Sequence, residues 1–504
     1  MQTKEHPSLE QSSLNKYQTL ASNAVLISVG TFGSKLLVFL MVRFYTGYLS
    51  PADYGTADLL TQTANLLIPL FSLGITDGVF RFAVVKNNRQ AGVFTVGFYT
   101  VTAGCILLLA AIPMLAQISA IGSYAWLIAA FVAASCYHGL CAQFIRARGN
   151  VTLFAVQGLI NTALVIGLNI LFLAVFRFGI AGYVLSVAVA NLITTGMLVW
   201  KEQLWNQIML RFHWGLWWEM LRYSVPFIPT SAFWWITSVS DRYMVTAFLG
   251  SELTGIYSVA YKIPTILTII SAVFMSAWQF SAITESTGNR KEHIHFYSRV
   301  WQFFQVTMFL CGASMIALAQ NEIKLLAAES YYTAWRCIPF LAMAMVFAAF
   351  SNFMDSVYIV TKRSIHSLWT AMLGAAINIV LNLFLIPSAL GIQGAALATF
   401  VSYFIVFAVR TVNARAYIPF RFYPVVFIGC TLILVIQTIV IVLQLPLWQF
   451  VQAAGIGLIL LLGHQPLRSG ISKLGFPIFK KIKAHFESLS IKEKRGNEDD
   501  TNGF

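Results

Sequence analysis

Two adjacent charged residues, Asp241 and Arg242, interrupt a long apolar stretch of the sequence. The stretch before them reads "YSVPFIPTSAFWWITSVS", and the one after them reads "YMVTAFLG". A charged side chain at the centre of a bilayer costs between ~2.5 and ~15 kcal/mol, so charges there usually serve a function. The pair therefore indicates either two charges that neutralise each other or an arginine that meets an anionic substrate beside a supporting carboxylate.

Three further cations, Lys35, Arg43 and Lys262, also lie within apolar runs rather than in loops. Lys35 falls just past the middle of its run, too deep for its ammonium to snorkel to the headgroups, which favours a place in a cavity. Arg43 lies near the outer end of the same run, where snorkelling and cavity function are both open. Lys262 lies about two turns below the outer end of its run.

Polar residues follow one side of several apolar runs. Ser28, Thr31 and Lys35 share a helical face, as do Ser231, Ser238 and Arg242 on a later run. Such stripes are unsuited to lipid and predict a water-filled cavity that is more basic than acidic towards its outer side. We predict that the substrate is bound by eight residues: Lys35, Arg43, Arg242, Lys262, Asp241, Asp58, Gln62 and Asn65.

Other polar residues favour structural roles. Asp355 lies near the inner end of its run, where it can cap loop contacts, and His138 is either a proton site or a buried histidine with a hydrogen-bond partner. The six cysteines lie in or at the ends of apolar runs without metal-type spacing. We therefore expect no metal, no cofactor and no catalytic residue.

The composition is that of a polytopic membrane protein. The 504 residues are 58% hydrophobic and only 10% charged, with a mean hydropathy of +0.73, whereas soluble domains carry roughly 25% charged residues. About 20 apolar residues are needed to cross the hydrocarbon as a helix, and we count about fourteen such runs. They lie near 21–44, 56–76, 93–115, 122–145, 151–176, 180–200, 223–249, 254–282, 297–319, 337–360, 365–386, 391–411, 423–444 and 448–463. The fold class is thus predicted to be an all-α membrane protein.

The net charge is +14, but the basic residues follow the expected sides of the membrane and do not form a patch that would bind nucleic acid. With the N-terminus inside, the tails and the even-numbered loops hold 26 of the 33 lysines and arginines. These loops are predicted at 77–92, 146–150, 201–222, 283–299, 361–364 and 410–422. This distribution follows the positive-inside rule and predicts cytoplasmic termini. The tail segment "FPIFKKIKAHFESL" (476–489) also reads as a basic amphipathic helix on anionic headgroups.

An internal repeat relates the two halves of the chain. "YLSPADYGTADLLTQTANLLIPL" from Tyr48 aligns with "FLGSELTGIYSVAYKIPTILTII" from Phe248, so that Gly55 matches Gly255 and Val42 matches Arg242. Six runs per repeat give both halves the same direction, which predicts two lobes related by a pseudo-two-fold axis along the membrane normal. The predicted division is a tail at 1–20, an N-lobe at 21–200, a linker at 201–222, a C-lobe at 223–412, two extra helices at 413–463 and a basic tail at 464–504.

The same stretches carry a family resemblance. "LRYSVPFIPTSAFWWITSVSDRYMVTAFLGSELTGIYSVAYKIP" (221–264), "RFYTGYLSPADYGTADLLTQ" (43–62) and "GIQGAALAT" (391–399) resemble bacterial polysaccharide and O-antigen flippases. The resemblance implies the fold of the multidrug/oligosaccharidyl-lipid/polysaccharide exporters, in the bacterial cytoplasmic membrane. It also implies an undecaprenyl-pyrophosphate-linked oligosaccharide as substrate, moved from the inner to the outer leaflet, with membrane lipids, a polysaccharide polymerase and chain-length machinery as partners.

Three other functions stay open. A lipid II flippase of the same superfamily differs only in its substrate. A cation-coupled drug exporter of the same fold should have an acidic cavity, and the basic set counts against it. A membrane glycan polymerase or ligase needs a sizeable outside loop, whereas the longest one predicted here is Gln320 to Arg336. We therefore expect a transporter and not an enzyme.

Overall fold

The computed structural model describes residues 33, 36–84, 90–118, 121–285, 290–361, 363 and 365–470. Within these ranges the chain is helical and contains no strand, as the composition predicts. Lys35 and the amphipathic tail segment 476–489 lie outside the described residues.

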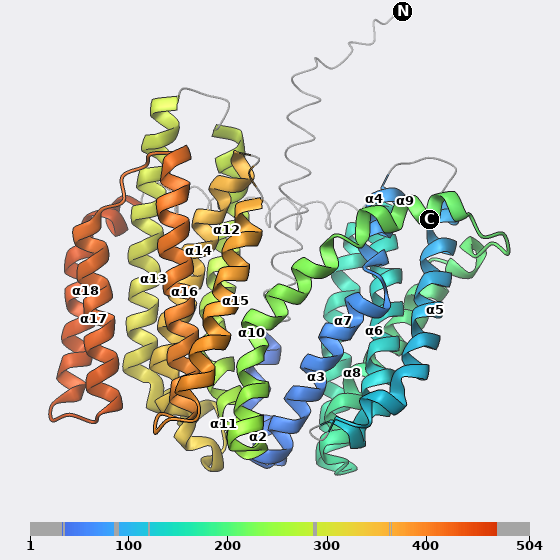
Figure 1. Cartoon of the computed structure of the whole chain (residues 1–504), viewed down its shortest axis with the longest axis horizontal. Helices are drawn as coiled ribbons and strands as arrows, with labels where there is room; N and C mark the ends of the chain where they lie inside the picture. Colours follow the sequence, from blue (N-terminus) through green and yellow to red (C-terminus); the bar gives the residue numbers. More distant parts are fainter. Residues whose placement is uncertain are drawn as a thin grey trace, which may run out of the picture.

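The helices form two lobes (Figure 1). The first contains α2 (Val42–Tyr48), α3 (Pro51–Phe71), α4 (Ile75–Ala83), α5 (Gln90–Leu115), α6 (Ala125–Ala147), α7 (Val151–Asn169) and α8 (Gly179–Lys201). The second contains α10 (Phe227–Leu249), α11 (Ser251–Lys262), α12 (Thr265–Glu285), α13 (Arg290–Leu326), α14 (Ile338–Val360), α15 (Ile365–Leu385) and α16 (Ile392–Tyr417). The linker helix α9 (Trp214–Ser224) joins the lobes, and α17 (Pro424–Val442) and α18 (Trp448–Gly470) pack beside α13.

In the described residues, eleven helices are long and apolar enough to cross a membrane, or twelve if α3 and α4 form one bent span. The predicted count of fourteen is therefore not confirmed. One difference is the first predicted run, 21–44, which lies mostly outside the described residues. The other is α10, whose 23 residues can span the hydrocarbon at 1.5 Å each, but whose charged and hydroxyl residues lower its hydropathy.

The two lobes meet at one end and diverge towards the other (Figure 1). We call the first the turn end, because the turn Leu249–Ser251 between α10 and α11 lies there. We call the second the linker end, because it carries α4 and α9. The helix α10 runs between these ends, so that it belongs to the C-lobe but starts beside the N-lobe.

Local sequence explains how α3 and α4 are shaped. The α3 helix begins with Pro51 after Ser50, whose Oγ accepts the Asp53 N–H at 3.2 Å and caps the first turn. It ends where Leu73 and Gly74 both take a left-handed conformation, and α4 continues at an angle of 55°. Gly78 on α4 then allows α9 to pack closely, because a Cβ there would lie 2.6 Å from Ser224 Oγ. The start of α10 is thereby fixed against the N-lobe.

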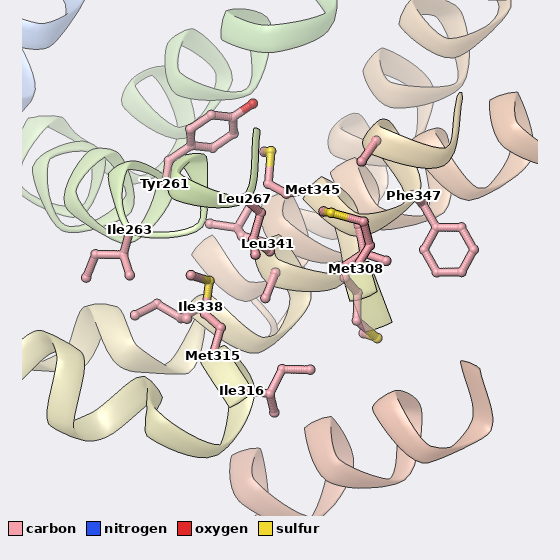
Figure 2. Close-up of a cluster of buried hydrophobic side chains, with 14 of the residues drawn as sticks. Tyr261, Ile263, Leu267, Met308, Met315, Ile316, Ile338, Leu341, Met345 and Phe347 are labelled. Atoms are coloured by element: carbon pink, nitrogen blue, oxygen red, sulfur yellow. The ribbon is translucent and has the colours of Figure 1, made fainter. Parts of the chain in front are cut away.

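The C-lobe has the larger apolar core, built around α14. In the part of α14 that is apolar enough to span a membrane, 83% of the residues are buried. Leu341 and Met345 of α14 contact the core beside Leu267 of α12 and Met308 of α13 (Figure 2). Such a packed core makes the lobe suited to moving as a rigid unit.

Two loop predictions are wrong. The predicted cytoplasmic loop 410–422 begins inside α16, which continues to Tyr417, so Arg410 is buried in the lobe rather than free in a loop. The predicted outside loop from Gln320 to Arg336 is also largely helical. The long helix α13 reaches Leu326, and Glu329–Arg336 forms a 3₁₀ helix, η4. In both places charged residues mark where apolarity ends, whereas the helix continues past them.

Candidate substrate site between the lobes

The repeat-matched glycines bring the backbones of the two lobes into direct contact. A Cβ on Gly55 would lie 2.3 Å from the Ser251 carbonyl oxygen, and one on Gly255 would lie 1.8 Å from that of Pro51. The two contacts are equivalent, because Pro51 and Ser251 occupy the same position in the two repeats. Glycine is required at both positions for α3 and α11 to cross at backbone contact, and this crossing places the charged residues one turn away.

Asp58 and Arg242 form an ion pair across this contact. Arg242 Nε lies 3.0 Å from Asp58 Oδ2, and both side chains are almost fully buried, at 4% and 3% exposure. Ser258 Oγ donates to the same oxygen of Asp58 at 2.8 Å. The Arg242 guanidinium donates through one terminal nitrogen to the Ser238 carbonyl at 3.0 Å and lies 4.4 Å from the centre of the Tyr261 ring. Because Nε meets Asp58 without hydrogen-bond geometry, its N–H has no hydrogen-bond acceptor.

Asp241 has different partners from its neighbour Arg242. Its Oδ2 accepts hydrogen bonds from the Tyr257 hydroxyl at 2.5 Å and from the Thr399 hydroxyl at 3.5 Å. Its Oδ1 accepts the backbone N–H of Arg242 at 2.8 Å. All of these donors belong to the C-lobe, and the salt bridges of the described residues do not join the two neighbouring side chains. The two neighbouring side chains therefore form no ion pair with each other in the described part of the chain, although their charges act on each other, and the ion-pair partner of Arg242 is a carboxylate of the other lobe.

Three more predicted residues lie beside this ion pair. Gln62 donates to Asp58 Oδ1 at 3.4 Å. Lys262, half-buried on α11, is a second cation whose charge acts on Asp58, and its ammonium forms no ion pair within the described residues. Asn65 is exposed. Along α3 the three predicted polar residues thus pass from the buried Asp58 to the exposed Asn65.

Arg43 occupies a separate contact between the lobes. Its guanidinium donates to the carbonyl oxygen of Ala327, directly after α13, where a cation suits the end of a helix. On the same side, the Ala328 N–H donates to Thr46 Oγ1 at 3.0 Å, and the Tyr331 hydroxyl donates to the Leu49 carbonyl at 2.9 Å. Burial raises the pKa of Tyr331 well above its ordinary value, so it stays a donor. This group joins α2 to η4 rather than lining the Asp58–Arg242 site.

Aromatic side chains lie both at the contact between the lobes and in the interior of the C-lobe. Trp235 donates from its ring nitrogen to the Gln62 carbonyl at 2.8 Å, across the lobes. Tyr257 is fully buried against Asp241, and Tyr261 lies beside Arg242. The side chain of Trp234 is outside the described part of the chain.

The sequence reasoning missed one buried cation, Arg410. It is 1% exposed and donates to Thr370 Oγ1 at 2.8 Å and to the Ser351 and Ser367 carbonyls at 3.1 and 3.3 Å. Its nitrogen also lies 3.4 Å from Asp355, which thus pairs with a buried arginine. The signal was available, because Arg410 falls inside the apolar run 391–411. His138, in the N-lobe, is hydrogen-bonded to Gln157 at 2.8 Å.

This arrangement is suited to non-covalent binding of an anion. The Arg242 guanidinium at the lobe contact presents charge-assisted donors, and a second cation, Lys262, lies close by. Among the described residues, Asp58 is the carboxylate that pairs with Arg242 from the opposite lobe.

Residues 20–281, more than half of the chain, match the family described as polysaccharide biosynthesis protein. The chain belongs to this family. A comparison with curated proteins finds no match. The predicted family and its all-helical membrane architecture are thereby confirmed.

Solved structures of transporters share the fold. One is the lipid II flippase MurJ in an inward closed conformation, with a TM-score of 0.67 and 12% identity over 89% of this chain and 100% of that one. An inward-facing multidrug resistance MATE family transporter of the MOP superfamily has a TM-score of 0.62 and 12% identity, over 76% of this chain and 95% of that one. A MOP superfamily transporter from Pyrococcus furiosus has a TM-score of 0.55 and 13% identity, over 78% of this chain and 96% of that one. This polysaccharide biosynthesis family protein is thus a membrane protein with a flippase-type transporter fold.

Proposed function

We propose that the protein is a flippase that turns an undecaprenyl-pyrophosphate-linked oligosaccharide from the inner to the outer leaflet of the bacterial cytoplasmic membrane. The observation that carries the proposal is Arg242, a buried arginine at the contact of the two lobes that is paired with Asp58 of the opposite lobe, with Lys262 as a second cation close to Asp58. A pyrophosphate carries about two negative charges at neutral pH and is bound well by such donors. No covalent bond changes in this process, so no catalytic residue is required.

In this mechanism Asp58 holds Arg242 while the substrate site is empty. The pyrophosphate enters between the diverging lobes from the linker end and competes with Asp58 for Arg242 and Lys262. Loss of the Asp58–Arg242 pair weakens the contact at the turn end, and the lobes then separate there. The acyl tail stays in lipid, and an inside-negative potential favours outward movement by about 2.3 kcal/mol per charge per 100 mV.

Lys35 and Arg43 have different proposed roles. We propose that Lys35 meets the substrate through its charge, so that Lys35→Ala loses export while Lys35→Arg keeps part of it. Arg43 acts at the α2–η4 contact, which must open to release substrate on the outer side.

The proposal places the linker end in the cytoplasm. Leu210 in the linker is 98% exposed, and Glu252 at the turn end is also exposed. In a cysteine-free background, a membrane-impermeant maleimide added to intact spheroplasts should label Glu252→Cys and not Leu210→Cys. Labelling of Leu210→Cys alone would contradict the orientation.

A lipid II flippase is the second candidate, because the matching flippase MurJ covers 89% of this chain and lipid II has the same pyrophosphate linkage. Deletion of the gene distinguishes the two. Our proposal predicts that an undecaprenyl-linked oligosaccharide accumulates on the inner leaflet while peptidoglycan synthesis continues. Accumulation of lipid II would support the second candidate instead.

A further inference from the structure

A cavity of about 210 Å³ lies within the C-lobe, and Tyr261 forms part of its wall. Its walls come from α10, α11, α12, α14, α15 and α16. The volume equals that of about seven waters at ~30 Å³ each and is below the ~300–1,000 Å³ of pockets for drug-sized ligands. An occupant must therefore be small, and one sugar ring is of this order.

The walls combine apolar and hydroxyl groups. Met345, Val406 and the rings of Tyr261 and Tyr403 supply carbon surface. Thr237, Thr265 and Thr268 supply hydroxyl oxygens, and Arg410 adds its guanidinium. A sugar ring needs this mixture, because its C–H faces pack on apolar or aromatic surface while its hydroxyls need nearby donors and acceptors.

One buried polar group of the cavity has no hydrogen-bond partner. Ser351 is 3% exposed, and its Oγ forms no hydrogen bond. A buried hydroxyl without a partner is costly, so a ligand that supplies one is favoured. Asn352, next along α14, also lines the cavity and is exposed.

The position of the cavity connects it to the proposed phosphate site. Tyr261 lines the cavity, and its ring centre lies 4.4 Å from the Arg242 guanidinium carbon. In Figure 2 its hydroxyl points away from the apolar cluster around Leu267 and Leu341. A group attached directly to a phosphate on Arg242 therefore needs to pass only one aromatic ring to reach the cavity.

We propose that this cavity is a subsite for the sugar that is joined directly to the pyrophosphate. The proposal rests on the proposed function, because it takes Arg242 as the pyrophosphate site. The subsite gives the protein a way to tell a sugar-bearing carrier from the bare carrier lipid, and it makes the first sugar, rather than the outer sugars, the part of the glycan that is read.

The test compares two kinds of lipid on purified protein in nanodiscs. One is undecaprenyl pyrophosphate without sugar, and the others carry a single glucose, galactose or N-acetylglucosamine. We expect at least one sugar-bearing lipid to bind about tenfold more tightly than the bare lipid, the equivalent of one or two hydrogen bonds. Thr268→Phe, which fills the cavity, should abolish this difference and leave binding of the bare lipid unchanged.

Two other variants complete the design. Ile270→Phe places the same phenylalanine side chain at an exposed position two residues along α12 and should keep the tenfold difference. Ser351→Ala removes only the unpartnered hydroxyl and should reduce the difference about threefold, without a bulky side chain that could disturb folding.

Each outcome is decisive. If the bare lipid binds but no sugar tightens binding, or if Thr268→Phe keeps the difference, the cavity holds only water and the subsite proposal is wrong. If neither kind of lipid binds the parental protein, the proposed function itself fails, and the subsite fails with it.

Discussion

The repeat-equivalent helices α3 and α11 cross each other with the same backbone geometry but carry different chemistry. Gly55 and Gly255 each lie against the first residue of the opposite helix. One turn further on, the equivalent positions hold Asp58 on α3 and Ser258 on α11, and these two side chains are hydrogen-bonded to each other. The next equivalent turn holds Gln62 and Lys262, so the anion is on one lobe and the cation on the other.

The shared glycines and the differing charges serve two separate steps: contact between the lobes and binding of the substrate. Symmetric glycines let the two lobes close, which requires only close backbone approach. Asymmetric charges make the closed contact depend on an ion pair, and an ion pair can be displaced by an anionic substrate, whereas a glycine contact cannot. The residues that the two repeats share therefore form the contact between the lobes, and the residues in which the repeats differ form the substrate site.

Breaking the symmetric part should have the largest effect. In Gly255→Leu the side chain meets the Pro51 carbonyl, a backbone atom that cannot rotate away, so α3 and α11 cannot cross as they do. We expect essentially complete loss of export. A disulfide between Thr46→Cys and Ala328→Cys should also no longer form; in the parent, the Thr46 hydroxyl oxygen lies 3.0 Å from the Ala328 backbone nitrogen across the lobes.

Gly196→Leu is the matched control, because a Cβ at Gly196 meets nothing within 4 Å. It should keep both export and crosslinking. Normal crosslinking in Gly255→Leu would show that the glycine crossing does not hold the lobes together.

Exchanging the asymmetric residues should have the next largest effect. Asp58→Ser leaves Arg242 buried without its counter-charge, a loss of roughly 3–5 kcal/mol. The double exchange Asp58→Ser/Ser258→Asp moves the carboxylate by one hydrogen-bond distance and keeps it near Arg242. We expect thermal unfolding in detergent to show that the exchange recovers most of the lost stability. If the double variant is as unstable as Asp58→Ser, the carboxylate must be on α3 and cannot be supplied by α11.

The smallest effect is expected where no charge crosses between the lobes. Tyr257→Phe removes one donor to Asp241 and leaves the Thr399 and backbone donors in place, a loss of about 1.5–3 kcal/mol for a bond to a charged group. Crosslinking between Thr46→Cys and Ala328→Cys should be unchanged, because Asp241 is bonded within its own lobe. Loss of crosslinking would place Asp241 in the contact between the lobes.

The sequence predicted what depends on apolarity and repetition. Apolar runs gave the all-helical membrane fold, and the offset of 200 residues brought Gly55 to Gly255. The partner of Arg242 could not be predicted in the same way, because adjacency in the chain favoured Asp241. On a helix, neighbouring side chains point about 100° apart, and so Asp241 faces its own lobe while Arg242 faces Asp58. Arg410 was missed because a charge at the end of an apolar run reads as a loop.

The most direct test of the central claim is glycan export by Asp58→Asn/Arg242→Gln. Neutralising both partners removes the buried unpaired charge, and amides can hydrogen-bond without a counter-ion, so membrane abundance should be near the parental level. If Arg242 binds the pyrophosphate, export should stay at least tenfold below the parental level, because the substrate still lacks its cation. Export restored to near the parental level would show that Arg242 serves only to pair with Asp58, and would contradict its assignment as the substrate-binding residue.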